Sequence, residues 1–325
     1  MPLNVKQALE KAINLFKKNH LTSSWLDAEV LLASVLKTDR SFIISHGERE
    51  LSLSQKKQFN RYIKLRINHY PLAYIIGHKE FYSLDYIVTP VVLIPRPESE
   101  LLVDLALDFY RKKPSSTIID LGTGSGCLII ALQKNLSNNP NAFALDISTS
   151  ALTLAKKNAS RHNLKNINFL KSDLLTIFIQ KQKYLSNSKH LIILANLPYV
   201  PLDIVKKEPS ISREPKLALV GGIDGLDIYR RLSEQIYTLS ELTKLPITLI
   251  CEINPEQKKS FQKIWKEKVI FKTDLAKKTR VGIVEIKTVR SNDRTDFYKI
   301  IISFPLFWVH LSSLVQKIQL HWRQP

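Results

Sequence analysis

The sequence predicts an α/β protein with a mainly parallel sheet, covered by helices on both faces and preceded by a smaller helical segment. From residue 117 onward, short apolar runs alternate with longer helical stretches, which is typical of parallel sheets. Before residue 71, apolar residues recur every three or four positions, as they do on one face of a helix. The chain has 325 residues, 44% of them hydrophobic, so it can bury a sizeable core and is long enough for two domains.

Three helices are expected in the first 70 residues. The first covers residues 5–16. The second begins at Ser23 or Ser24, which are favourable N-cap residues, and carries Trp25 on its apolar face. The third covers residues 54–70 and ends at a proline, which cannot continue a helix. The lysines and arginines on its outer face are interpreted as solvated.

The sheet is expected to follow a short connecting region. Short strands are predicted over residues 80–88 and a helix over residues 98–113. Seven apolar runs then have the length and composition of strands. They cover residues 117–121, 142–145, 167–170, 191–196, 247–253, 269–272 and 281–287. Helices are expected between most of them.

Composition and charge limit the function classes. The net charge of +19 would suit a nucleic-acid partner, but the basic residues are spread along the chain and are not interleaved with aromatic residues. We therefore interpret the charge as compositional and keep nucleic-acid binding as the alternative. Cys127 and Cys251 are too few for a disulfide framework and have no CxxC partner, which fits a cytoplasmic protein without a metal site.

Targeting and membrane segments are not expected. Charged residues interrupt the N-terminal stretch, which has no cleavage site of the signal-peptide kind. The longest uncharged run, residues 300–316, is shorter than the ~20 apolar residues of a membrane helix.

A glycine-rich turn and three acids point to a ligand at one edge of the sheet. The segment DLGTGSG begins with Asp120, follows the first strand of the α/β region and opens a helix. Asp146 and Asp173 follow the next two strands. Parallel strands end at the same edge of a sheet, where α/β proteins bind ligands. Asp146 could bind both hydroxyls of a ribose, and Asp173 an adenine amino group. An acid next to the turn disfavours a pyrophosphate and favours a cationic or neutral ligand, and S-adenosylmethionine fits because it carries a sulfonium and an ammonium group.

The segment NLPY follows the fourth of these strands and would lie at the same edge. The Asn196 side-chain oxygen and the Leu197 carbonyl could each accept one hydrogen from a flat NH2 group. Pro198 fixes the chain direction, and Tyr199 offers an aromatic face for stacking. Holding both N–H bonds would aim the nitrogen lone pair at a methyl group and stabilise the charge that develops. Alone, this segment would be interpreted as a strand-ending turn; together with the acids and glycines it predicts methyl transfer.

Further segments give the sequence a specific resemblance. They are LDAEVLL (26–32), PLAYIIGHKEF (71–81), LIPRPESE (93–100), REPKLALVGGIDGLDIYRR (213–231) and EINPEQ (252–257). With the glycine turn and NLPY, they resemble the HemK/PrmC family, the protein-(glutamine-N5) methyltransferases of peptide chain release factors. Arg96 lies between two prolines and is expected to point into a cleft between domains. Glu214 and the glycines near residues 221–225 fit functional and turn-forming roles about equally well.

The resemblance implies a Rossmann-like seven-stranded methyltransferase sheet, mostly parallel with an antiparallel last strand. It implies a helical domain with a short β linker at residues 1–88 that docks the release factor, and a catalytic domain at residues 89–290. Residues 291–325 form a C-terminal tail without a counterpart in the family, and we expect a monomer. The implied donor-binding residues are Asp120, Gly122, Thr123, Gly124, Ser125, Gly126, Asp146, Asp173, Leu174 and Asn196. The implied catalytic and substrate-binding residues are Asn196, Leu197, Pro198, Tyr199, Arg96 and Glu214.

Two positions depart from the family pattern, and two other functions stay open. Leu197 replaces the first proline of Asn-Pro-Pro-Tyr, and Leu174 stands where relatives often have an aromatic residue. Asn-Leu-Pro-Tyr also occurs in ribosomal RNA adenine dimethylases, but those enzymes lack a long segment before the glycine turn. The case for DNA adenine methylation is weaker still, because no target-recognition domain is evident. The second alternative is a non-catalytic protein that keeps the fold for binding.

Overall fold

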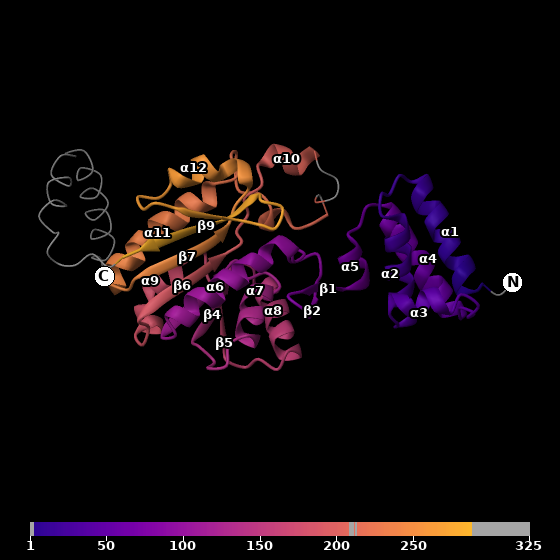
Figure 1. Ribbon diagram of the computed structural model, residues 1–325, viewed down its shortest axis with the longest axis horizontal. Coiled ribbons are helices and arrows are strands. Elements are labelled where there is room, and N and C mark those ends of the chain that lie inside the picture. Colours follow the sequence, from indigo (N-terminus) through magenta and orange to yellow (C-terminus); the bar gives the residue numbers. More distant parts are fainter. Residues whose placement is uncertain (1–2, 208–210, 212, 288–325) are drawn as a thin grey trace, which may run out of the picture. The chain divides into compact units, whose positions relative to one another are not determined.

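The structure, a computed structural model, describes residues 3–207, 211 and 213–287 (Figure 1). The predicted tail, residues 291–325, and the predicted boundary at residue 290 lie outside the described residues. The predicted division at residue 88 stays a prediction. In the described part of the chain, no helix is both long enough and apolar enough to cross a bilayer.

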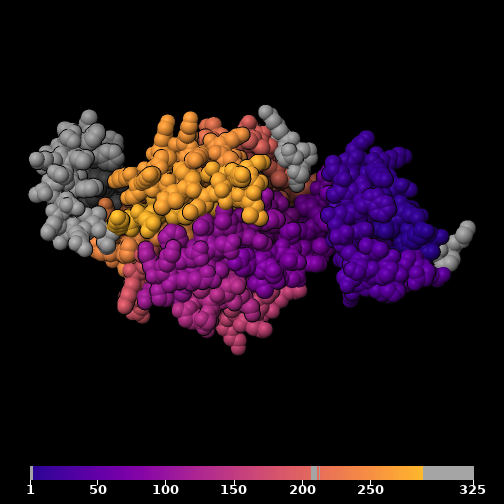
Figure 2. Space-filling model, in the orientation of Figure 1, coloured from indigo at the N-terminus to yellow at the C-terminus, as the bar shows by residue number. Residues whose placement is uncertain are grey.

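The first 70 residues are helical, as the apolar periodicity predicts. The five N-terminal helices are α1 (Val5–Lys18), α2 (Ser24–Leu36), α3 (Arg40–Ser45), α4 (Leu53–Ile67) and α5 (Leu72–Ile76). Their apolar faces share one buried cluster that includes Phe16, Leu31 and Phe59. The outer surface of this N-terminal helical region is the indigo part of Figure 2. The short helices α3 and α5 were not expected from the sequence.

One predicted detail of α2 is wrong, the placement of Trp25 on its apolar face, whereas the predicted start at Ser23 or Ser24 is confirmed. Trp25 is 56% exposed, because Ser24 and Asp27 take the inward positions of the first turn, where Arg66 of α4 pairs with Asp27 at 2.6 Å. Ser23 is the N-cap residue, but its side chain makes no capping hydrogen bond. The Ser24 hydroxyl instead donates to the carbonyl of Leu21 at 2.6 Å. At this helix start Asp27 therefore makes a tertiary contact with α4, and Ser24 makes a local one.

All seven predicted strands of the main sheet are present. They are β3 (Ser116–Leu121), β4 (Ala142–Asp146), β5 (Ile167–Lys171), β6 (His190–Ala195), β7 (Ile247–Glu252), β8 (Ile270–Thr273) and β9 (Thr279–Ile286). Their order is β5-β4-β3-β6-β7-β9-β8. The pairs from β5 to β7 are parallel, whereas β9 is antiparallel to both β7 and β8. The antiparallel last strand is thus confirmed, and it lies between its neighbours instead of at the edge. A separate hairpin, β1 (His78–Phe81) and β2 (Leu84–Ile87), precedes the sheet.

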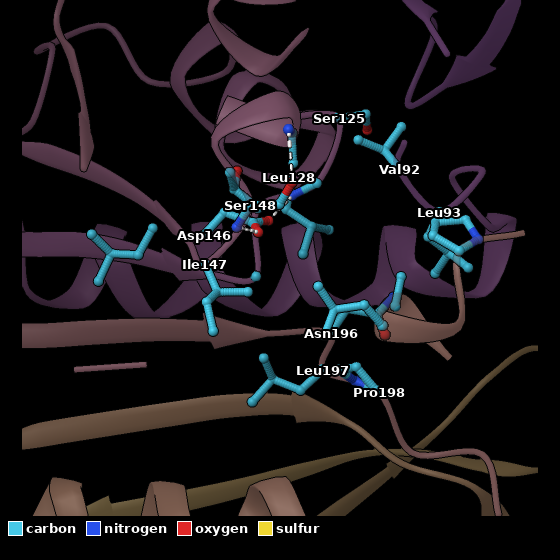
Figure 3. A pocket seen from close by; sticks show the side chains of 18 of the residues that line it. Val92, Leu93, Ser125, Leu128, Asp146, Ile147, Ser148, Asn196, Leu197 and Pro198 are labelled. Carbon is cyan, nitrogen blue, oxygen red and sulfur yellow. Dashed lines mark hydrogen bonds between the residues drawn. The ribbon is translucent and has the colours of Figure 1, made fainter. Parts of the chain in front are cut away.

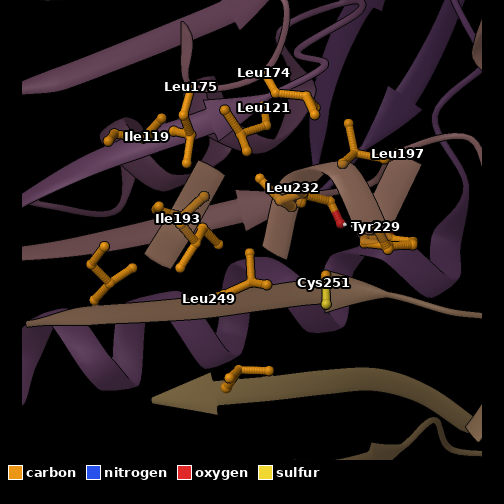
Figure 4. Packing of buried hydrophobic residues seen from close by; sticks show 14 of the residues in the cluster. Ile119, Leu121, Leu174, Leu175, Ile193, Leu197, Tyr229, Leu232, Leu249 and Cys251 are labelled. Carbon is orange, nitrogen blue, oxygen red and sulfur yellow. Dashed lines mark hydrogen bonds between the residues drawn. The ribbon is translucent and has the colours of Figure 1, made fainter. Parts of the chain in front are cut away.

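Helices cover both faces of the sheet because the strands are apolar on both sides. The remaining helices are α6 (Glu100–Lys112), α7 (Cys127–Lys134), α8 (Thr149–Arg161), α9 (Thr176–Gln180), α10 (Leu202–Lys207), α11 (Asp227–Thr243) and α12 (Lys258–Gln262). On one face, Ile119 and Ile193 share a buried cluster with Leu232 of α11 (Figure 4). On the other face, Ile118 and Ile192 belong to the cluster that includes residues of α6 and α7.

Candidate active site

Strand register brings the glycine turn and the NLPY segment together. In the parallel pairing of β3 and β6, Leu121 lies opposite Ala195, so each segment starts at the same level on adjacent strands. The chain runs from β3 outward through β4 and β5, and then returns to β6 on the other side. Such a reversal of strand order creates a crevice at the carboxyl edge, where ligands of α/β proteins bind.

The glycine turn is closely packed against its neighbours. A Cβ on Gly122 would lie 3.0 Å from Leu197 Cδ2, and one on Gly126 would lie 2.9 Å from Ile130 Cδ1. Both glycines also have positive φ, 65° and 82°, which other residues rarely adopt. The backbone N–H of Gly124 donates to Asp146 Oδ2 at 2.9 Å. The turn is thus fixed between the end of β4 and the loop after β6.

Asp120 is buried beneath the turn. Its side chain is 0% exposed, and Oδ2 accepts a hydrogen bond from the Thr123 hydroxyl at 2.6 Å. Among the described residues, Oδ1 has no partner. Burial raises the pKa of Asp120 to about 7, the Asp146 charge acts in the same direction, and the Thr123 hydrogen bond opposes both. Asp120 therefore holds its proton far more strongly than an exposed aspartate does.

The pocket has acidic and neutral polar groups facing a ligand. Arg96 and Arg231 are the cations among the described residues that line it, and each pairs with an acid, Glu214 and Asp173 respectively. The Asp146 carboxylate accepts from the backbone N–H groups of Gly124 and Ser148, while burial raises its pKa. Figure 3 shows Asp146 and Asn196 lining the same pocket. With both cations paired and Asp146 without a cationic partner among the described residues, the pocket favours a neutral or cationic ligand over a phosphate.

The NLPY segment has one polar end in the pocket and one in the core. Asn196 donates from Nδ2 to Ser99 Oγ at 2.8 Å, and no described residue donates to its Oδ1. Leu197 is 4% exposed and belongs to the same buried cluster as Tyr229 (Figure 4). Tyr199 turns away from the pocket lining and donates to buried Glu252 Oε1 at 2.7 Å. Its hydroxyl is therefore a structural anchor in this arrangement.

Residues 219–225 form hydrogen bonds with the backbone at the end of the NLPY segment. The N–H of Val200 donates to the Leu219 carbonyl at 2.9 Å, and the N–H of Gly221 donates back to the Val200 carbonyl at 3.0 Å. The Gln257 side chain donates to the carbonyls of Tyr199 and Asp224, both at 2.9 Å. The glycines of this segment thus allow two backbone loops to meet.

The predicted site residues divide into two groups by position. Those lining the pocket are Arg96, Gly122, Thr123, Gly124, Ser125, Asp146, Asp173, Leu174, Asn196, Leu197 and Pro198. Those outside its lining are Asp120, Gly126, Tyr199 and Glu214. Glu214 is 4% exposed and accepts from the N–H of Ile94 and from Arg96, so it fixes the segment before α6.

Comparison with known proteins gives the chain a family. Residues 7–77 match the PrmC N-terminal domain, and residues 112–268 match a methyltransferase domain. The release factor glutamine methyltransferase of Koribacter versatilis is 34% identical over 238 residues, which cover 72% of this chain and 82% of that protein. The protein of the same name from Clostridium botulinum is 33% identical over 284 residues, 85% of this chain and 97% of that protein.

The chain belongs to the release factor glutamine methyltransferase family. Membership confirms the resemblance that the sequence motifs indicate. Among solved structures, the hMettl16 catalytic domain in complex with MAT2A 3'UTR hairpin 6 is 17% identical, with a TM-score of 0.48 over 73% of this chain and 82% of that one.

Several groups at this methyltransferase pocket were not predicted from the sequence. Ser99, Arg231 and Gln257 each bond a predicted site residue, and Glu252 receives bonds from two residues of the pocket region. All four lie in motifs that the sequence singles out: Ser99 in LIPRPESE, Arg231 in REPKLALVGGIDGLDIYRR, and Glu252 and Gln257 in EINPEQ. Their partners are more than 50 positions away along the chain, so no local pattern could reveal the contacts.

Proposed function

We propose that this protein transfers a methyl group from S-adenosylmethionine to the side-chain amide nitrogen of the glutamine in the Gly-Gly-Gln motif of class I peptide chain release factors. The observation that carries the proposal is the Asn196 amide at the end of β6, beside the glycine turn, whose Oδ1 accepts no hydrogen bond from a described residue. The protein would act in the cytoplasm as a monomer and support translation termination.

The residues present fit S-adenosylmethionine by their chemistry. Both cations of the described lining are paired with acids, Arg231 with Asp173 and Arg96 with Glu214, and Asp146 has no cationic partner among the described residues, which suits a ligand with a sulfonium and an ammonium group. We assign the ribose hydroxyls to Asp146 and the adenine to Asp173 and Leu174. Residues 122–126 would hold the remainder of the molecule along the turn.

The chain's own groups supply orientation. S-adenosylmethionine, when bound, supplies an electrophilic methyl carbon, whose bond to sulfur breaks as the new bond to nitrogen forms. Asn196 Oδ1 and the Leu197 carbonyl would each accept one N–H of the substrate amide. Both acceptors hold the nitrogen lone pair toward the methyl carbon and stabilise the positive charge that develops on nitrogen. The methylated nitrogen then releases a proton to solvent, so no strong base is required.

The substrate polypeptide would be held by groups that line the pocket, Pro198 and Arg96, and by their neighbours Tyr199 and Glu214. Pro198 fixes the direction of the chain after the two acceptors, and Tyr199 borders them. Arg96 and Glu214, already joined as an ion pair, are proposed to border the substrate entrance. The helical N-terminal region is proposed to dock the release factor.

Methyl labelling tests the proposal. Purified full-length protein with tritiated S-adenosylmethionine should label a class I release factor, and a factor with the Gly-Gly-Gln glutamine changed to alanine should stay unlabelled. Ribosomal RNA in a parallel reaction serves as the competing acceptor. Label in the RNA alone would reject the proposal, and donor binding without label in either acceptor would indicate a non-catalytic protein.

A further inference from the structure

A buried chain of hydrogen bonds connects the Asn196 amide to a carboxylate that the proposed chemistry does not use. Asn196 Nδ2 donates to Ser99 Oγ at 2.8 Å, and Ser99 Oγ donates to Glu252 Oε2 at 2.5 Å. Ser99 and Glu252 are each 2% exposed. Ser99 closes the short 3-10 helix Pro97–Ser99 before α6, Asn196 follows β6, and Glu252 ends β7.

The carboxylate gives this chain of bonds its direction. Glu252 accepts on both oxygens, because the Tyr199 hydroxyl donates to Oε1 at 2.7 Å and Ser99 donates to Oε2. Burial raises the pKa of Glu252, whereas the hydrogen bonds from Ser99 and Tyr199 favour its charged form, in which a carboxylate can only accept hydrogen bonds. The single proton of the Ser99 hydroxyl is therefore committed to Glu252, and only its lone pairs remain for Asn196.

This commitment distinguishes the two ends of the Asn196 amide. The oxygen and nitrogen of a carboxamide have nearly the same shape, and a hydrogen-bond network decides which end points where. A hydroxyl that presents only lone pairs selects the NH2 end. The Oδ1 end is then left to face the pocket, where it can accept a hydrogen bond from a substrate.

We infer that Ser99 is a positioning residue for methyl transfer, and that it orients the Asn196 amide by transmitting the acceptor character of Glu252. The inference rests on the proposed function. With the amide turned over, the NH2 group of Asn196 would oppose the NH2 group of the substrate. Turning it over would also redirect the Ser99 proton to Asn196 and leave Glu252 Oε2 buried without a donor, which is strongly unfavourable.

Substitution of Ser99 tests the inference. In the full-length protein, Ser99→Ala should lower kcat about 10- to 100-fold, because the amide can then turn over, while the Kd for S-adenosylhomocysteine stays within about twofold. Ser99→Thr keeps the hydroxyl and should restore kcat to within about threefold. Ser188→Ala is the matched control: it removes another buried serine hydroxyl, bonded to Thr117 at 2.6 Å, and should leave kcat unchanged.

A kcat of Ser99→Ala equal to that of the wild type would overturn the inference and leave the proposed function standing. So would a Ser99→Thr variant as slow as Ser99→Ala, because the hydroxyl would then not be the cause. If the wild type itself transfers no methyl group, the proposed function fails and a second measurement decides. In NMR spectra, the side-chain NH2 signals of Asn196 can be identified by their loss in Asn196→Ala. The hydrogens of this NH2 group should exchange with solvent about tenfold faster in Ser99→Ala than in the wild type. Equal exchange rates would overturn the inference independently of activity.

Discussion

Asn196 is the residue on which the proposed chemistry depends. Its Oδ1 is an acceptor at the carboxyl edge of the sheet, beside the glycine turn. We expect Asn196→Ala to lower methyl transfer at least about 100-fold, because one of the two acceptors that orient the nitrogen and stabilise its charge is lost. Donor affinity should change by less than about threefold. Methyl incorporation and calorimetric titration with S-adenosylhomocysteine measure the two quantities.

Asn187→Ala provides the matched control for that substitution. Asn187 lies in an exposed turn before β6, at the opposite end of the same strand. The same chemical change there should leave transfer and donor affinity unaltered. Transfer by Asn196→Ala at the rate of this control would contradict the proposed grip on the substrate amide.

Asp120 makes stability depend on pH. Its pKa in the folded protein is about 7, against 3.8 for an ordinary aspartate, because burial disfavours the charge. Between these values the folded state keeps a proton that the unfolded chain releases, so folding is favoured on the acid side. The contribution of Asp120 should therefore fall as pH rises from about 4 to about 7, by up to ~1.4 kcal/mol per pH unit.

Asp120→Asn isolates this contribution, because asparagine keeps an acceptor for Thr123 and cannot ionise. Denaturant unfolding of both proteins at several pH values measures it. As pH rises from about 4 to about 7, the free energy of unfolding of the wild type should decrease relative to that of the variant. A constant difference between the two proteins would show that Asp120 does not carry the raised pKa.

At the scale of elements, the loop after β6 is held by the packing of the Leu197 side chain and by backbone hydrogen bonds, as well as by its proline. Leu197 replaces a family proline, yet its side chain is buried in the core and would lie 3.0 Å from a Cβ on Gly122. Residues 219–225 add backbone hydrogen bonds from the other side. The leucine thus ties the loop to the glycine turn through packing.

Gly225→Ala should disrupt this loop. A Cβ at Gly225 would lie 2.0 Å from the Tyr199 carbonyl oxygen, and its φ is 77°. The backbone must therefore move, and we expect transfer to fall at least about tenfold and the loss of stability to exceed the ~1–2 kcal/mol cost of a left-handed alanine. Methylation assays and denaturant unfolding test both effects.

Gly77→Ala is the control for backbone strain alone. Gly77 has a similar φ of 85°, but nothing lies within 4 Å of a Cβ built there. This variant should lose only ~1–2 kcal/mol and keep its transfer rate. Equal behaviour of the two variants would mean that the contact with the Tyr199 carbonyl does not matter.

At the scale of the whole molecule, the pocket joins segments that follow four strands, β3 to β6. A ligand bound there should stabilise the folded chain by mass action, by about 2.7 kcal/mol at 100 times its Kd. S-adenosylhomocysteine should therefore raise Tm by several degrees in a thermal unfolding assay. NAD at the same concentration should produce no shift, because its pyrophosphate would face Asp146 and find both cations of the described lining paired. A larger shift with NAD would contradict the assigned ligand.

The sequence by itself determined the strands, the helical start and the residues at the strand ends. Alternation and periodicity depend on local backbone geometry, so β3 to β9 could be predicted from apolar runs alone. The acids and Asn196 could be placed at one edge because parallel strands end together. Strand order, and with it the position of β9 between β7 and β8, has no local signal.

Only the tertiary structure decided which side chains meet. It exposed Trp25, turned Tyr199 toward Glu252, and paired Arg96 with Glu214. It also placed Ser99, which a local interpretation assigns to a helix start, between Asn196 and Glu252. Burial and hydrogen bonding depend on neighbours that are distant along the chain, and the energetic demand that every buried polar group find a partner acts only once those neighbours are assembled.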